Sequence, residues 1–323
     1  EEALPIEIKP LVRTRFLQSF FVWLRLLRFS MGMMFGTLTR RLTPGGSAQR
    51  LRLFLEDMGG LWVKAGQLIS LRIDLLSPEM VQALTQLQYH AYGFDPKISR
   101  KIIEDTIQCP IETYFDVFED MPFAAASISQ VHRAHLREEN IWVAIKVKRP
   151  GIKELFERDI KMITRLINTV GKIPSVSFIS WDGMIRELKQ IMTEELDYRY
   201  ESANLRRMRK ILKPHKIYVP KFFERYSGTD VIVMEMVEGL LMSDYLRIIK
   251  TDPERVQAWC VENNVKTTRA GSLLMRSFYR QLFEDNLFHG DLHPGNIILL
   301  RNSRVALIDL GTVGNLESRF IAN

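Results

Sequence analysis

The sequence predicts an α+β fold made of two lobes and a helical N-terminal extension. The first 110 residues show mainly helical spacing of apolar residues, whereas apolar and polar residues alternate over 128–148, as expected for two strands. Helical segments dominate again afterwards, and a second hairpin pattern lies near residue 300. We therefore expect a helical extension over 1–110, a small β-containing lobe over 111–236 and a mostly helical lobe over 237–323.

Composition is that of a globular protein of about two domains. The chain has 323 residues, of which 46% are hydrophobic and 26% are charged. Its cysteines, Cys109 and Cys260, form neither a disulfide framework nor a zinc-binding pair, which favours a reducing compartment.

The start of the chain is basic and apolar at once. Residues 16–24 and 29–38 are dominated by Phe, Leu, Met and Trp, which favours anionic lipid over nucleic acid as the partner. Arg25 and Arg28 interrupt the stretch before it reaches the roughly 20 apolar residues of a membrane span. A helix lying in the membrane surface and a helix packed on protein, including a second copy, fit equally well. The arginines in this part of the chain are Arg13, Arg15, Arg25, Arg28, Arg40, Arg41, Arg50 and Arg52.

Helix and strand signals follow in order along the chain. Pro44-Gly45-Gly46 and Gly59-Gly60 are expected to separate the first helices, and Ser77-Pro78 is a favourable helix start. Residues 137–140 would join the strands of the first hairpin. Helices are expected at 11–42, 48–57, 61–71, 79–88, 99–107, 152–170, 181–212, 243–249 and 270–285, and strands at 128–136, 142–148, 216–219, 230–236, 297–300 and 305–308.

The most informative motif is His289-Gly290-Asp291-Leu292-His293-Pro294-Gly295-Asn296, which Asp309-Leu310-Gly311 follows after an apolar hairpin. Phosphoryl transfer in kinase-like folds needs such a set of side chains. Asp291 would orient or deprotonate the acceptor, while Asn296 and Asp309 would hold the Mg²⁺ that bridges the phosphates of ATP. The spacing therefore predicts a nucleotide-dependent enzyme of the kinase type.

A lysine and a helical carboxylate complete such a site. Lys146 ends the strand pattern Val-Ala-Ile-Lys, the form taken by the lysine that pairs with nucleotide phosphates. Glu194, Asp197 and Glu201 share one face of the helix expected over 181–212, whereas Glu195 is rotated away from it. Like charges on one face need cations nearby, and Lys146 and Lys64 are the candidates.

The phosphate-covering loop departs from the usual glycine-rich form. Phe123-Ala124-Ala125-Ala126-Ser127 occupies its place, and alanine disfavours the conformations that glycine adopts there. We expect a stiffer loop that offers the backbone amides of residues 125–127 and the Ser127 hydroxyl to nucleotide.

Together with Lys64-Ala65-Gly66-Gln67, these residues resemble the UbiB family of atypical kinases, also called AarF-domain-containing or ADCK-type kinases. The likeness covers roughly residues 50–315, and ordinary protein kinases lack both the Lys64–Gln67 motif and the alanine loop. It implies a protein-kinase-like fold whose helical extension covers the active site, and a role in ubiquinone or other prenylquinone metabolism.

The resemblance also implies roles for single residues. Lys146 and Glu201 would form the strand–helix ion pair, and Asp291 would occupy the catalytic-base position. Residues 124–127 would line the nucleotide site, with Asn296 and Asp309 on magnesium. The segment Glu235–Val237 would contact adenine. Lys64 and Gln67 would lie over the active site, with Lys64 facing Glu195 or Asp197, and these four residues would regulate it.

A covering helix placed where a peptide would dock disfavours protein phosphorylation. We therefore expect an ATPase-like or lipid-directed activity with ATP and Mg²⁺, at the surface of a membrane that faces a reducing compartment or an organelle matrix. Expected partners are a prenylquinone or isoprenoid lipid and quinone-biosynthesis enzymes, not nucleic acid; a homodimer would use the same apolar patch. A full helical lobe would continue beyond residue 323, so we expect it to be incomplete here.

Three other functions remain open from the sequence, one of which is direct protein kinase activity. Small-molecule phosphotransferases such as aminoglycoside and choline kinases share the loop around Asp291, including a histidine at the position of His293. A non-catalytic pseudokinase scaffold would use nucleotide only as a structural switch. The phosphotransferases do not explain the Lys64–Gln67 motif or the alanine loop. For the scaffold, the presence of all the polar site residues argues against complete loss of nucleotide binding.

Overall fold

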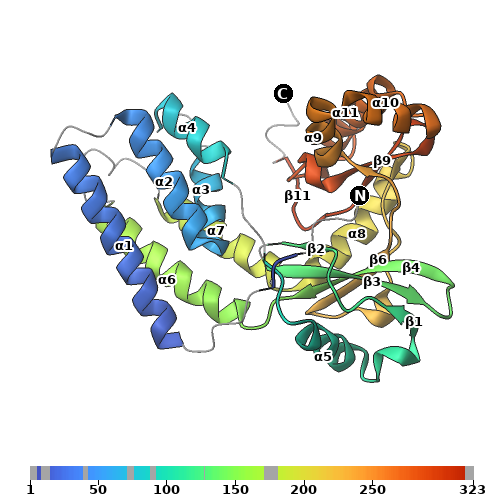
Figure 1. The fold of residues 1–323 in the computed structure, drawn as a ribbon, viewed down its shortest axis with the longest axis horizontal. Helices are drawn as coiled ribbons and strands as arrows, with labels where there is room; N and C mark the ends of the chain where they lie inside the picture. Colours follow the sequence, from blue (N-terminus) through green and yellow to red (C-terminus); the bar gives the residue numbers. More distant parts are fainter. Residues whose placement is uncertain are drawn as a thin grey trace. The chain divides into compact units, whose positions relative to one another are not determined.

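The computed structural model describes residues 6–8, 15–38, 43–70, 76–87, 92–126, 128–170 and 181–316. The chain divides into two compact units (Figure 1). The first unit comprises 1–100, 120–131 and 147–196, and the second comprises 101–119, 132–146 and 197–323.

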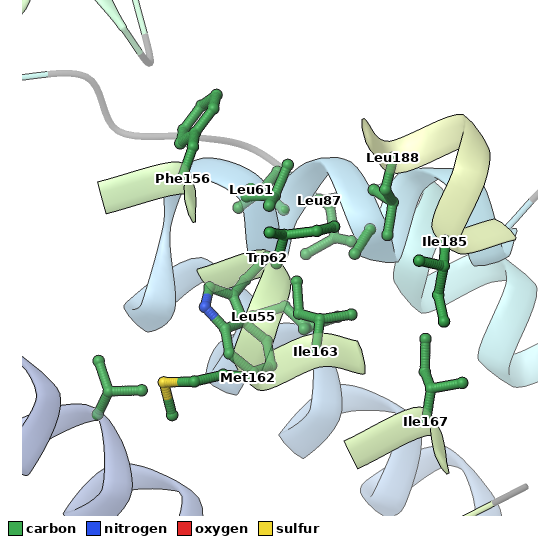
Figure 2. Packing of buried hydrophobic residues seen from close by; sticks show 14 of the residues in the cluster. Leu55, Leu61, Trp62, Leu87, Phe156, Met162, Ile163, Ile167, Ile185 and Leu188 are labelled. Atoms are coloured by element: carbon green, nitrogen blue, oxygen red, sulfur yellow. The ribbon is translucent and has the colours of Figure 1, made fainter. Parts of the chain in front are cut away.

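The first unit is built from helices around an apolar core. Figure 2 shows Trp62, Ile163 and Leu188, which come from three different helices, packed in this core. Burial of such side chains is the main source of stability for short helices. The helices are α1 (Arg15–Leu38), α2 (Pro44–Met58), α3 (Gly60–Ser70), α4 (Pro78–Thr85), α6 (Ile152–Val170) and α7 (Trp181–Glu195).

Gly66 lets α3 pack closely against its neighbours. A Cβ atom at this position would lie 2.5 Å from Leu87 Cδ1 and 2.7 Å from Leu55 Cδ1, well inside van der Waals contact. Ala65 is likewise buried, at 5% exposure, whereas Gln67 is exposed. The two small residues of the Lys64–Gln67 motif therefore have a packing role of their own.

A five-stranded sheet has the order β1-β3-β4-β6, with β2 (Ala124–Ala125) paired to β3. The sequence missed β1 (Phe115–Phe118), and it correctly predicted the hairpin of β3 (Ser129–Leu136) and β4 (Ile141–Lys148). Asn140 completes the hairpin turn with φ of 51°, a conformation that Asn tolerates. The remaining strand is β6 (Val231–Glu235), and α5 (Pro96–Ile107) precedes the sheet.

Several helices and two smaller sheets also belong to the second unit. In the larger one, of order β5-β10-β9-β7, the hairpin strands pair Val305 with Leu299 and Leu307 with Ile297. This register brings the backbone of Asn296 to that of Ile308, whose amide donates to the Asn296 carbonyl at 3.1 Å. The elements are α8 (Tyr198–Leu212), α9 (Met242–Thr251), α10 (Pro253–Glu262), α11 (Thr267–Phe283), β5 (Ile217–Tyr218), β7 (Leu240–Leu241), β8 (Phe288–His289), β9 (Ile297–Leu300), β10 (Arg304–Leu307) and β11 (Val313–Gly314).

The prediction of a single helix over 181–212 is wrong. The segment forms two helices, α7 and α8, separated at Leu196 and Asp197. Asp197 adopts an extended conformation and its side chain accepts from the Arg199 amide at 3.0 Å, so it caps the start of α8. Consequently Glu194, Asp197 and Glu201 do not share one helix face.

Other differences are smaller. Pro44–Gly46 was expected as a break, but Thr43 caps this segment and α2 already begins at Pro44. The helix expected over 11–42 is described only as Arg15–Leu38, because residues 11–14 and 39–42 lie outside the described ranges. The sequence also missed α10.

A Gly239→Ala substitution is expected to destabilise the second unit by about 2 kcal/mol, a typical cost of overpacking. The new Cβ would clash with the backbone oxygen of Leu299, which cannot move without distorting β9. Urea denaturation measures the change. Gly271→Ala in α11 is the control: nothing lies within 4 Å of its Cβ, so we expect no loss and a gain of up to ~1 kcal/mol. Equal stability of both variants would contradict the packing argument.

Candidate active site

Lys146 is the centre of an ion-pair cluster in the second unit. Its Nζ lies 2.9 Å from both carboxylate oxygens of Glu201 on α8 and 3.4 Å from Asp309 Oδ2. The alternation of β4 buries Ile145 and Val147 on the opposite face, which directs Lys146 toward α8. The Glu201 side chain is only 5% exposed, so its charge depends on this lysine.

The cluster fixes the charge of its members. Burial alone lowers the pKa of Lys146, but the carboxylates of Asp309 and Glu201 outweigh it and raise the pKa well above its ordinary value. Burial would raise the pKa of Asp309, yet Lys146 and the Gly311 amide lower it to about 2. At neutral pH the site therefore presents a cation beside two anions.

The His289–Asn296 loop is anchored by the short strands β8 and β11, which pair His289 with Val313. The buried His289 accepts a hydrogen bond at Nδ1 from the Asp291 amide at 3.1 Å. Burial lowers the pKa of His289, more than the Asp309 carboxylate raises it. The His289 ring therefore holds the backbone of Asp291, and the Asp291 carboxylate is left exposed to solvent.

Asn296 is oriented by the same loop. Its Nδ2 donates to the Asp291 carbonyl oxygen at 3.1 Å, so the side-chain oxygen points away from that contact. The residue is buried, at 8% exposure. The Asn296 side-chain oxygen, which can bind a metal ion, therefore lies at the end of the β9–β10 hairpin, where Ile308 leads into Asp309.

These residues fit a magnesium ion that is shared with nucleotide. The described part of the chain holds no cluster of three or more His, Cys, Asp or Glu side chains able to bind a metal by themselves. Magnesium in phosphoryl-transfer sites instead takes one or two protein oxygens and completes its shell with phosphate and water. Asn296 and Asp309 would supply those oxygens; Asp309 Oδ1 also accepts from the Gly311 amide at 3.0 Å, which sets its rotamer.

The segment Glu235–Val237 is held at both ends. The hydroxyl of Tyr218 lies 2.7 Å from both carboxylate oxygens of Glu235, and the Lys221 amide donates to Glu235 Oε2 at 3.1 Å. Burial and the Glu235 carboxylate raise the pKa of Tyr218 to about 12, so it stays a donor at neutral pH. Val237 packs on the cluster that includes Ile298.

The alanine loop is a closed turn in the first unit. Ala124 and Ala125 form β2 and pair with Val131 and Gln130, and the Ala126 amide donates to the Ser129 carbonyl at 2.8 Å. The Ala126 amide was expected to be free for nucleotide, and it is instead used within the turn. Ser127 lies outside the described residues.

Lys64 Nζ lies 3.4 Å from Glu195 Oε1, one of the two carboxylates expected for it. Lys64 and Glu195 belong to the first unit, whereas Asp197 belongs to the second and pairs with Arg199 at 2.6 Å. Gln67 is exposed on α3. The covering of the site by Lys64 and Gln67 stays a prediction.

Sequence reasoning missed residues that support the site. Asn204 donates from Nδ2 to the Leu310 carbonyl at 3.1 Å and so ties α8 to the segment after Asp309. Its position three residues after Glu201, on the same helix face, was the available signal. Tyr218 carried no signal, because its contact with Glu235 depends on tertiary packing.

Comparison with known proteins agrees with this geometry. The family model described as the ABC1 atypical kinase-like domain matches residues 86–323. A "Probable protein kinase UbiB" of Photobacterium profundum is 33% identical over 283 residues, which cover 85% of this chain and 50% of that protein. One of Vibrio parahaemolyticus is 33% identical over 276 residues, which cover 84% and 48%. The chain thus spans about half the length of these curated relatives.

A solved structure, the complex of Rv3197 with erythromycin from Mycobacterium tuberculosis, is similar with a TM-score of 0.53. It is 23% identical, and the match covers 92% of this chain and 68% of that one. The fold is accordingly the expected α+β, two-lobe, kinase-like fold. The chain belongs to the ABC1, or UbiB, family of atypical kinase-like proteins.

Proposed function

We propose that this protein is an atypical kinase-type enzyme that binds ATP with Mg²⁺, hydrolyses it slowly and supports ubiquinone or prenylquinone biosynthesis at a membrane. The observation that carries the proposal is the convergence of Lys146, Glu201 and Asp309, with Lys146 Nζ at 2.9 Å and 3.4 Å from the two carboxylates. The UbiB name of the relatives supports the quinone pathway.

Each residue of the site has a proposed role. Lys146, held by Glu201, would neutralise the α- and β-phosphates of ATP, and Asn296 and Asp309 would hold magnesium. The metal, when bound, would withdraw charge from the phosphates. The exposed carboxylate of Asp291 would orient an acceptor hydroxyl or water, and Glu235–Val237 would meet adenine. Electrostatic positioning of this kind suffices for phosphoryl transfer.

Helix α1 supports a membrane partner. Trp23, Leu27, Met31 and Phe35 recur every fourth residue and are 51%, 56%, 56% and 63% exposed, which makes one apolar face. Arg28, beside this face, would meet anionic headgroups. Among helices in the described ranges, none combines enough length and apolar character to span a bilayer. Lipid contact would therefore be peripheral; the rival occupants of this face are a second copy or a quinone-biosynthesis enzyme.

Anionic liposomes that contain a prenyl-phenol analogue are expected to raise nucleotide hydrolysis several-fold. A Leu27→Glu/Met31→Glu variant should lose this stimulation and keep the liposome-free rate, because the changed residues lie on α1 alone. Val261→Glu, at a residue 74% exposed on α10, is the control and should respond like the parent. Unchanged turnover of the parent with every lipid would count against the membrane proposal.

The acceptor is tested separately. Radiolabelled ATP with a panel of hydroxylated small molecules would transfer label if the protein were a phosphotransferase like aminoglycoside or choline kinases. Release of inorganic phosphate alone supports the ATPase proposal. Nucleotide binding without any release in a long single-turnover experiment would identify a pseudokinase scaffold.

A further inference from the structure

Gln281 is a buried polar residue of α11 that the proposed chemistry does not use. It is 1% exposed, and both ends of its amide are bonded. Oε1 accepts from the backbone amide of His289 at 3.0 Å, and Nε2 donates to Ser277 Oγ at 3.2 Å. Its side chain therefore bridges α11 and the first residue of the His289–Asn296 loop.

The bridge continues into a line of polar groups, the last of which, Asp285, is 25% exposed. Ser277, 1% exposed, lies 3.2 Å from His215 Nδ1, and His215 Nε2 lies 3.1 Å from Asp285 Oδ2. All these residues belong to the second unit. Ser277 sets the orientation of the Gln281 amide group. Its Oγ accepts a hydrogen bond from Nε2, so Oε1 is left to accept from the His289 amide.

We infer that Gln281 is a positioning residue that sets Asp291 for phosphoryl transfer through the His289 backbone. His289 accepts from the Asp291 amide at 3.1 Å, so a shift of His289 moves the catalytic-base position with it. The strands that anchor the loop, β8 and β11, contain only two residues each and provide little anchorage of their own. The Gln281 contact replaces the anchorage that longer strands would give.

Two substitutions separate positioning from simple packing. Gln281→Met is close in volume and removes the acceptor for His289, whereas Gln281→Glu keeps an acceptor oxygen but buries an acid. A buried carboxylate is costly, so the Glu variant should have the lower Tm of the two. Positioning predicts the opposite order for activity, because only Glu still holds the His289 amide.

We expect Gln281→Met to lower kcat for ATP hydrolysis roughly tenfold, with KM for MgATP within about twofold, as for a loop displaced by less than 1 Å. Gln281→Glu should recover most of that loss at a temperature where both variants are folded. Ser277→Ala, which leaves Oε1 in place, should lose less than Gln281→Met. Activities that follow Tm, with Met above Glu, would overturn the inference.

This kinetic test rests on the proposed ATP hydrolysis, so a second readout is independent of it. Amide hydrogen exchange of residues 288–296 without nucleotide should be faster in Gln281→Met than in the parent and in Gln281→Glu. A parent that hydrolyses no ATP but shows this exchange pattern refutes the proposed function and retains the positioning role. Equal exchange in all three proteins refutes the role of Gln281 whatever the turnover.

Discussion

An Asp309→Asn protein is expected to fold like the parent yet lose the magnesium-dependent thermal stabilisation by ATP. Asn keeps an oxygen that accepts from the Gly311 amide, and Lys146 stays 2.9 Å from Glu201. The site without nucleotide should therefore keep its structure. The substitution removes a carboxylate whose pKa is about 2, and hence a full negative charge at working pH. Magnesium loses its only anionic protein ligand in the proposed set.

The measurement is a thermal shift with ATP, with and without Mg²⁺. A ligand at a hundred times its Kd stabilises the folded state by about 2.7 kcal/mol, so the parent should shift by several degrees. ATP hydrolysis by Asp309→Asn should fall at least ~100-fold, because the metal contributes several kcal/mol to the transition state.

Asp105→Asn, at an exposed position of α5, is the matched control and should keep the full shift. ATP with EDTA should give the parent the small shift seen for Asp309→Asn. If Asp309→Asn keeps a shift of parental size that still requires Mg²⁺, the assignment of Asp309 to the metal is wrong.

Local patterns with strong periodicity allowed the sequence to predict much of the fold. Helix α6 has the predicted bounds, Ile152–Val170, because one face is apolar along its whole length. The β3–β4 hairpin was predicted because its residues alternate and its turn is polar. The long helix failed because Asp197 was read as part of an acidic face, although its side chain serves better as a cap.

The site was predictable in residue type and only partly in geometry. The motifs identify Lys146 and Asp309 despite a separation of 163 residues, and the structure brings them within 3.4 Å. Spacing alone does not select Glu201 among the neighbouring acids, although the family resemblance does; in the structure the break between α7 and α8 separates Glu201 from the others. The contacts of Tyr218 and Gln281 depend on how distant elements pack, which no local pattern encodes.

A Lys146→Met protein is expected to lose both stability and activity. The substitution leaves Glu201, 5% exposed, and Asp309 facing each other without a cation. Breaking a buried pair typically costs about 3–5 kcal/mol, and the 14% exposure of Lys146 places this one near the low end. Hydrolysis of ATP should fall at least ~100-fold, since the cation at the phosphates is gone.

The double variant Lys146→Met/Glu201→Met separates the two losses. Removing both charges relieves the unpaired carboxylate, so urea denaturation should show much of the lost stability restored, because apolar replacements of buried ion pairs are often neutral. Activity should stay at the level of the single variant, because no cation returns to the phosphates.

The exposed pair Arg247–Asp244, at 3.0 Å, serves as the comparison in a parallel double-mutant cycle. Its side chains are 71% and 44% exposed, so its coupling should stay below ~1 kcal/mol, while that of Lys146 and Glu201 should exceed it. Recovery of hydrolysis together with stability in the double variant would mean that Lys146 only holds α8 against the sheet. Recovery of stability alone would assign the lysine's charge to the bound phosphates.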